Sequence, residues 1–174
     1  LGRQKHSDAS PVLYALEAAW LTDRSFDQQA MSLLDQAIDD HPDNTRLRYS
    51  RAMLGEKLGN MALLESDLRY LLEIEPDNAT ALNALGYSLT DNTDRHSEAL
   101  VLIKKALALK PDDPAILDSM GWAYYNLGNL QLAIQFLQRA YDSFPDSEIA
   151  AHLGTVYWAI GDLERARQIW QKAL

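Results

Sequence analysis

Apolar side chains recur along this chain at intervals of three and four residues, the spacing of one face of an α-helix. In the clearest window, residues 114–145, two such stretches follow one another, with apolar positions at Ile116, Leu117, Met120 and Ala123 and then at Leu132, Ala133, Phe136, Leu137 and Ala140. Gly128 and Asn129 stand between the two stretches, as is typical of a helix C-terminus. No window shows the Val/Ile/Thr alternation of a β-strand. The pattern predicts an all-α chain built of helix pairs.

The helix pairs repeat at a fixed period. Four prolines, each followed by Asp, recur at spacings of 34, 35 and 34 residues: Pro42, Pro76, Pro111 and Pro145. Small residues fill two equivalent columns, with Leu64 as the one larger member: Ala18, Ala52, Gly86, Gly121 and Gly154, and Ala30, Leu64, Ala99, Ala133 and Ala166. Because two helices approach closely only where small side chains cross, these columns predict tight helix hairpins stacked in series.

The Pro-Asp steps predict where one pair ends and the next begins. Proline disfavours continuation of a helix, and an Asp side chain can accept hydrogen bonds from the unpaired amides at the next helix N-terminus. We therefore expect four aspartates to cap the first helix of copies two to five: Asp43, Asp77, Asp113 and Asp146.

This arrangement resembles the tetratricopeptide repeat family over residues 11–174. The fourth copy carries the family's motif residues Gly121, Tyr124, Gly128, Ala133, Ala140 and Pro145. The resemblance implies a right-handed α-solenoid of about five helix-turn-helix repeats, with about ten antiparallel helices. After a tail over residues 1–10, we expect a single solenoid with repeats at about 11–44, 45–78, 79–113, 114–146 and 147–174. Because the chain begins with Leu1, and its last repeat lacks a polar capping helix, we expect it to be a piece of a longer chain whose uncapped end is covered by further chain or by self-association.

In the family, certain columns of each first helix line a concave groove. Carried over to this sequence, they give the partner-binding candidates Arg46, Tyr49, Met53, Asn83, Tyr87, Asp118, Trp122, Tyr125, Asn126 and Trp158. Large amphipathic side chains bury much area at low entropic cost, so we expect Trp122 and Trp158 to be the hot spots. The alternative is that some of these aromatic residues pack between neighbouring repeats. We assign Trp20, Tyr124, Tyr157 and Trp170 to packing.

Charge narrows the partners. The chain has 16 Lys and Arg against 25 Asp and Glu, a net charge of −9, which argues against nucleic-acid binding. A local basic cluster stands out against this balance: Arg46, Arg48, Arg51 and Lys57. These side chains either receive a partner carboxylate or neutralise the acidic helix that follows, which contains Asp67.

Catalysis is not supported by the residues present. The chain has no Cys, no Gly-rich phosphate loop and no GxSxG motif. Its four histidines lack any metal-ligand spacing, and we expect them on the surface or in turns: His6, His41, His96 and His152. The acids available at groove columns are Glu56, Asp91 and Asp118. We therefore expect no catalytic residues, no metal and no cofactor.

The leading hypothesis is a non-catalytic scaffold or adaptor that binds a protein or peptide in the groove. A nucleic-acid-binding helical repeat and an enzyme with a groove site are the alternatives. Copies three to five also resemble bacterial outer-membrane tetratricopeptide lipoproteins that act as adaptors for periplasmic C-terminal-processing proteases. That resemblance implies a lipid anchor N-terminal to this chain, a location on the periplasmic face of the outer membrane, and a periplasmic protease and its substrates as partners; a cytoplasmic location is the alternative. The sequence contains no stretch long enough to predict a transmembrane segment.

Overall fold

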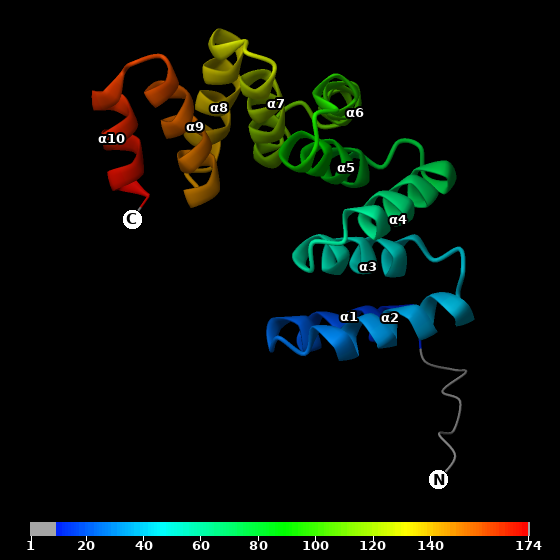
Figure 1. The fold of residues 1–174 in the computed structure, drawn as a ribbon. Coiled ribbons are helices and arrows are strands. Elements are labelled where there is room, and N and C mark those ends of the chain that lie inside the picture. Colours follow the sequence, from blue (N-terminus) through cyan, green and yellow to red (C-terminus); the bar gives the residue numbers. More distant parts are fainter. Residues whose placement is uncertain (1–9, 174) are drawn as a thin grey trace. The chain divides into compact units, whose positions relative to one another are not determined.

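The computed structural model describes residues 10–173, and this part of the chain is folded into helices (Figure 1). The elements are α1 (Pro11–Asp23), α2 (Asp27–Asp40), α3 (Thr45–Lys57), α4 (Met61–Ile74), α5 (Ala79–Asn92), α6 (His96–Leu109), α7 (Pro114–Asn126), α8 (Leu130–Ser143), α9 (Ser147–Ala159) and α10 (Leu163–Lys172). Over residues 10–173 there is no strand, and the predicted all-α fold is confirmed. The predicted tail and His6 lie largely outside the described residues.

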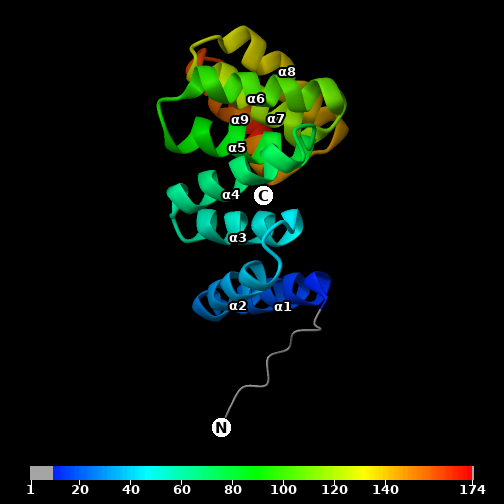
Figure 2. The same cartoon turned by 90° about the vertical axis from the view of Figure 1, so that its right-hand side faces the viewer.

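The chain divides into two compact units, Leu1–Pro76 (unit 1) and Asp77–Leu174 (unit 2). Within unit 1, α1 pairs with α2 and α3 with α4, and α1 and α2 both pack on α3. Within unit 2, α5 pairs with α6, α7 with α8 and α9 with α10, and the first helices stack in the order α5, α7, α9 (Figure 1). Figure 2 shows the α3–α4 hairpin of unit 1 from another side. Each unit is thus a stack of helix hairpins, and a single solenoid through both units stays a prediction.

In three hairpins, α3–α4, α7–α8 and α9–α10, the turn follows from a Gly-Asn or Gly-Asp step. At the end of α7, Gly128 has φ +78° and donates its N–H to the carbonyl of Tyr125, while the Asn129 N–H bonds to the carbonyl of Tyr124, each at 2.9 Å. This left-handed residue closes the helix, and the Asn129 side chain then accepts from Leu132 N–H (3.2 Å) to begin α8. One dipeptide therefore ends the first helix and starts the second.

The entry to each first helix corrects two of the four predicted caps. Asp113 and Asp146 cap α7 and α9, as expected. In α3 and α5 the capping side chain belongs instead to the following residue, Asn44 or Asn78. Asp43 is engaged elsewhere, because it accepts a hydrogen bond from the Tyr70 hydroxyl at 2.6 Å.

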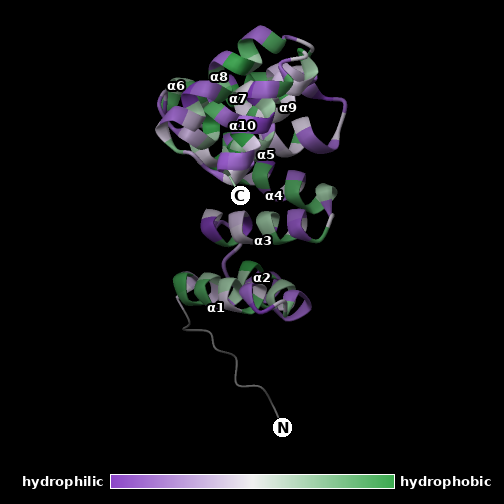
Figure 3. Cartoon of the chain, turned by 90° about the vertical axis from the view of Figure 1, so that its left-hand side faces the viewer, coloured by the Kyte–Doolittle hydropathy of each residue, from purple (hydrophilic) through white to green (hydrophobic). Residues whose placement is uncertain are grey.

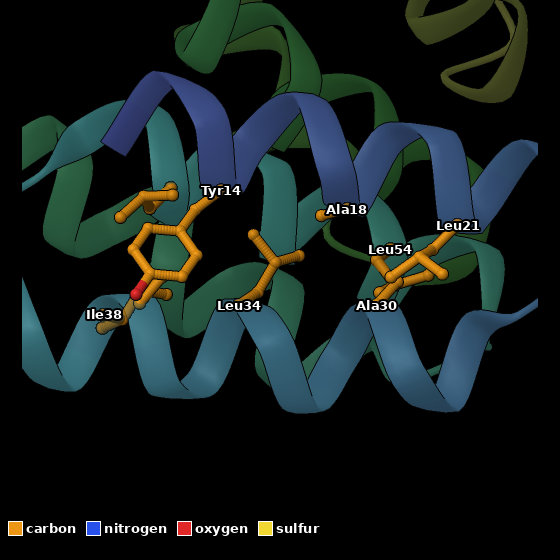
Figure 4. Close-up of a cluster of buried hydrophobic side chains, with 9 residues drawn as sticks. Tyr14, Ala18, Leu21, Ala30, Leu34, Ile38 and Leu54 are labelled. Carbon is orange, nitrogen blue, oxygen red and sulfur yellow. The ribbon is translucent and has the colours of Figure 1, made fainter. Parts of the chain in front are cut away.

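The small columns lie where helices cross. In unit 1 the α1–α2 crossing is formed by Ala18 and Ala30, flanked by buried Leu, Ile and Tyr side chains (Figure 4). In unit 2 a Cβ added to Gly121 would lie 2.5 Å from Cγ of Leu137 on α8. The repeat's periodicity is therefore a packing requirement, since a larger side chain would push the paired helices apart.

Helix α1 differs from the prediction for Trp20. The helix is largely apolar, as its colouring in Figure 3 shows, and it exposes Leu13 and Leu16 as well as burying Tyr14 and Ala18. Trp20 is 54% exposed, with the Arg24 guanidinium 4.6 Å from its ring centroid, so its assignment to packing is wrong. Trp20 lies on the side of α1 that also carries the exposed Leu13 and Leu16, and this position explains why it is not packed.

Candidate interaction surface

The predicted groove columns of unit 2 meet along the stacked first helices α5, α7 and α9. The Tyr87 hydroxyl on α5 donates to Glu148 on α9 (2.8 Å), and the Trp122 indole N–H on α7 donates to Asp91 on α5 (3.2 Å). These bonds join the three helices. Together with other exposed or half-buried positions of the same helices, the four bonded residues form what we call the first-helix face of unit 2: Tyr87, Asp91, Trp122, Tyr125, Asn126, Glu148, Thr155 and Trp158. Glu148 was not among the sequence candidates, although it occupies a groove column of the fifth copy.

Trp122 is the centre of an aromatic stack. Its ring lies 4.2 Å from the His152 ring and 4.9 Å from the Tyr125 ring, each at an interplanar angle of 17°. Two ring contacts and the hydrogen bond from its N–H to Asp91 fix the position of the Trp122 indole. Trp122 is therefore held in place by its own chain and is half-buried. The alternative that some groove aromatics pack between neighbouring repeats applies to much of the Trp122 side chain.

His152, which stacks on Trp122, also forms a buried pair with Asp118, and this pair corrects two expectations. His152 Nδ1 lies 2.9 Å and 3.0 Å from the two carboxylate oxygens of Asp118, joining α9 to α7. Asp118 is only 5% exposed and His152 only 9%, so His152 is not a surface histidine and Asp118 is not an open groove residue. Burial raises the pKa of the Asp118 carboxyl, and the hydrogen bond from His152 opposes that effect. Neither group is available to a ligand at the surface.

Tyr87 is held as a hydrogen-bond donor. Burial raises the pKa of its hydroxyl, and the hydrogen bond to the Glu148 carboxylate raises that pKa further. Tyr87 therefore stays protonated and keeps α5 tied to α9 across the face. The same direction holds for Tyr49 on α3, where burial and then the charge of Glu56 raise the pKa of the hydroxyl.

Trp158 is the large apolar side chain that this face leaves most open. It is 51% exposed, and its ring is tilted against Trp170 of α10 at 5.9 Å between centroids. Trp170 fills the space beside Gly154, in agreement with its assignment to packing. Asn126 is exposed beside the stack and donates to the carbonyl of Trp122 at 2.9 Å. The open indole of Trp158 thus lies on the same helix as Glu148 and His152, which hold Tyr87 and Trp122 in place.

The remaining candidates lie outside this arrangement. In unit 1 Arg46 is exposed, whereas Tyr49 and Met53 are half-buried. In unit 2 Asn83 is half-buried, and its Oδ1 atom is buried without a hydrogen-bond partner among residues 10–173. These positions do not show the hydrogen-bonded aromatic arrangement of α5, α7 and α9.

The basic cluster serves the fold of unit 1. Arg48 (3.1 Å) and Arg51 (2.7 Å) both pair with Asp67 of α4, and Lys57 pairs with Asp27 of α2 (2.7 Å). The hydrogen bond with Asp67 raises the pKa of the Arg51 guanidinium, which stays charged. Of the two interpretations, the structure supports neutralisation of acidic side chains for Arg48 and Arg51.

Residues 10–173 contain no group of three or more His, Cys, Asp or Glu side chains placed to hold a metal ion. None of the helices described here is both long and apolar enough to cross a membrane.

Comparison with known proteins decides the family. The family model of the tetratricopeptide repeat matches residues 92–151, which span the end of α5, all of α6, α7 and α8, and the start of α9. The chain belongs to the tetratricopeptide repeat family. Proteins of this family are generally non-enzymatic scaffolds for protein interactions.

Relatives of this tetratricopeptide chain include a much longer bacterial protein. This chain is 46% identical over 152 residues to the TPR repeat-containing protein PA4667 of Pseudomonas aeruginosa, a match that covers 87% of this chain and 26% of that protein. It is also 27% identical over 124 residues to bacteriophage adsorption protein A of Escherichia coli, covering 71% of this chain and 12% of that protein. The chain therefore spans about a quarter or less of the length of these curated relatives.

Solved structures agree on the fold. The tetratricopeptide protein TTC0263 of Thermus thermophilus superposes with a TM-score of 0.83 at 22% identity, covering 95% of this chain and 90% of that one. PilW, described as a widely conserved type IV pilus biogenesis factor, gives the same TM-score and identity over 98% of this chain and 77% of its own. At this identity the likeness shows the fold alone.

Proposed function

We propose that this chain is a non-catalytic protein-interaction module that binds a segment of a partner protein on the first-helix face of unit 2, with Trp158 as the main contact. The observation that carries the proposal is the open indole of Trp158 on α9, the helix whose Glu148 and His152 hold Tyr87 and Trp122 in place. Side chains that are fixed before binding lose little freedom when a partner arrives, and exposed tryptophans in such settings dominate binding energy.

Catalysis has little support at this face. Asp118, an acid that the groove columns supply, is buried and paired with His152. Asp91 and Glu148 are exposed, but each accepts a hydrogen bond from an aromatic side chain that it helps to hold. The first helices of unit 2 contain no Lys or Arg, so this face also lacks the basic side chains that nucleic acid requires. A protein partner is the ligand class that remains.

For the whole protein, we propose a lipid-anchored adaptor on the periplasmic face of the outer membrane that brings substrates to a C-terminal-processing protease. The support is the resemblance of copies three to five to bacterial lipoproteins of that role. Metabolic labelling of the full-length protein with a palmitate analogue, followed by membrane fractionation, tests the location. A protein without label in the cytoplasmic fraction would contradict it.

The interaction itself is tested by site-specific photocrosslinking in cells that make the full-length protein. A benzophenone amino acid is placed at Thr155 or Asn126 on the first-helix face, and at Val101 or Lys104 on the exposed side of α6 as matched controls. We expect one partner protein to crosslink from the first-helix positions and not from α6. Equal crosslinking from both sets of positions, or from α6 alone, would contradict the proposal.

A further inference from the structure

The basic side chains of the unit 2 helices are confined to one of its two sets of helices, whereas each set carries three acidic side chains. Its first helices, α5, α7 and α9, contain three acidic side chains, Asp91, Asp118 and Glu148, and no Lys or Arg. Its second helices, α6, α8 and α10, carry all the Lys and Arg of the unit's helices: Lys104, Lys105, Arg139, Arg165, Arg167 and Lys172. The face that presents Trp158 is therefore the acidic side of the unit.

The two exposed carboxylates of that face, Asp91 and Glu148, are positioned by hydrogen bonds and are not neutralised by a basic side chain. Asp91 uses Oδ1 to accept from Trp122, and Glu148 uses Oε1 to accept from Tyr87. The second oxygen of each carboxylate has no hydrogen-bond donor, and neither group pairs with a Lys or Arg, among residues 10–173. Each thus offers a positioned acceptor with a negative charge to an incoming group.

Exposed indole and fixed carboxylates together favour one partner chemistry. A Lys or Arg side chain binds a carboxylate by a charge-assisted hydrogen bond, and its charge is also attracted to the face of an indole. An acidic segment would meet like charge on this face without any basic side chain to offset it.

We propose that the first-helix face of unit 2 binds a cationic segment of a partner protein, in which Lys or Arg side chains meet Asp91 and Glu148 and an apolar side chain packs on Trp158. This inference rests on the proposed function and adds the chemistry of the partner. The occupant that competes with it is a second copy of this chain, whose α6 and α10 each carry more Lys and Arg than Asp and Glu.

The test uses three fluorescein-labelled peptides in which Lys, Gln or Glu alternates with Ala around a central Phe. Binding to the full chain is followed by fluorescence anisotropy. We expect the Lys peptide to bind at least about tenfold more tightly than the Gln peptide, by the attraction of two surface charges, and the Glu peptide to be weakest. Raising salt from about 0.05 M to 0.5 M should remove most of the difference, because it shortens the screening length.

The variants separate charge from structure. Asp91→Asn with Glu148→Gln keeps both hydrogen-bond acceptors for Trp122 and Tyr87 but removes the charges, and should weaken the Lys peptide by about tenfold. Asp39→Asn with Asp40→Asn makes the same change in net charge on exposed residues of α2 and should change affinity less than twofold.

Each other outcome overturns the inference. If Trp158→Ala weakens the Lys and Gln peptides alike while the amide pair changes nothing, the face binds peptides without charge selection; the proposed function stands and the inference falls. If none of the three peptides binds at up to about 1 mM, or if the two amide pairs act equally, the inference is wrong, and crosslinking still decides the proposed function. A dimer in light scattering that Trp158→Ala abolishes would assign the face to a second copy and would also overturn it.

Discussion

A buried carboxylate inside the α3–α4 hairpin gives a sharp test of the energetics. Asp67 is 1% exposed and accepts hydrogen bonds from Arg48 (3.1 Å) and from Nε and Nη2 of Arg51 (2.7 and 2.8 Å). The equivalent positions of the fourth copy, counted from its small columns, are Leu117, Met120 and Phe136. The second copy thus places an ionic triad where the fourth copy packs apolar side chains.

Removing one member of such a triad should cost far more than replacing all three. Asp67→Leu leaves two mostly buried guanidinium groups without their shared partner, and breaking a buried ion pair in this way costs about 3–5 kcal/mol. The triple variant Arg48→Leu, Arg51→Met, Asp67→Phe reproduces the fourth copy's side chains. We expect its stability to lie within about 1 kcal/mol of the original chain, or above it, because the desolvation cost of three charges is removed as well.

Hydrogen exchange measured by mass spectrometry resolves this hairpin from the rest of the chain. For Asp67→Leu, amides of α3 and α4 should exchange about a hundredfold faster, the equivalent of about 3 kcal/mol, while those of α7 and α8 serve as the internal control. A loss below about 1 kcal/mol for Asp67→Leu, or a triple variant as unstable as the single one, would refute the reasoning.

Three further predictions concern the hairpins of unit 2 and are measured by urea unfolding. Gly121→Ala should destabilise the chain by about 1–3 kcal/mol, because its Cβ would meet Leu137, and an unchanged midpoint would count against the close crossing. Gly128→Ala should cost about 1–2 kcal/mol from backbone conformation alone, since no atom lies within 4 Å of the added Cβ; a neutral effect would show that the turn adjusts. Asp113→Ala should cost about 1 kcal/mol through loss of the α7 cap, whereas its exposed neighbour Asp112→Ala should be neutral, and equal effects of the two would contradict the assignment.

The fold was largely predictable because the helix packing of each repeat requires particular residue types at fixed positions of the sequence. Small residues recur in the columns of Gly121 and Ala133, with Leu64 as the one exception, because the helices cross there, and this requirement can be read without coordinates. The caps were predictable only to within one residue. Asp43 and Asn44 are both good capping residues, and the choice between them depends on Tyr70, which lies 27 residues away in sequence from Asp43.

The interaction surface was predictable as a set of columns and not as an arrangement. Family columns placed Tyr87, Trp122 and Trp158 on one face, but which of them is open depends on neighbours from other helices. His152 stacks on Trp122 and binds Asp118, contacts that join residues 30 and 34 positions apart and leave no pattern in the sequence. The exposure of Trp20 and Trp170 likewise depends on neighbouring helices. Trp20 is exposed and Trp170 is half-buried, although the sequence predicts packing for both.

The central claim is that a partner protein binds the first-helix face of unit 2 through Trp158. The most direct measurement is a calorimetric titration of the crosslinked partner, once identified and purified, against the original chain, Trp158→Ala and Trp20→Ala. Trp20 is the matched control, because it is an equally exposed indole in the other unit. The account predicts that Trp158→Ala weakens binding by about thirtyfold or more while Trp20→Ala leaves it within twofold. Equal affinities for the original chain and Trp158→Ala, with both variants folded, would contradict it.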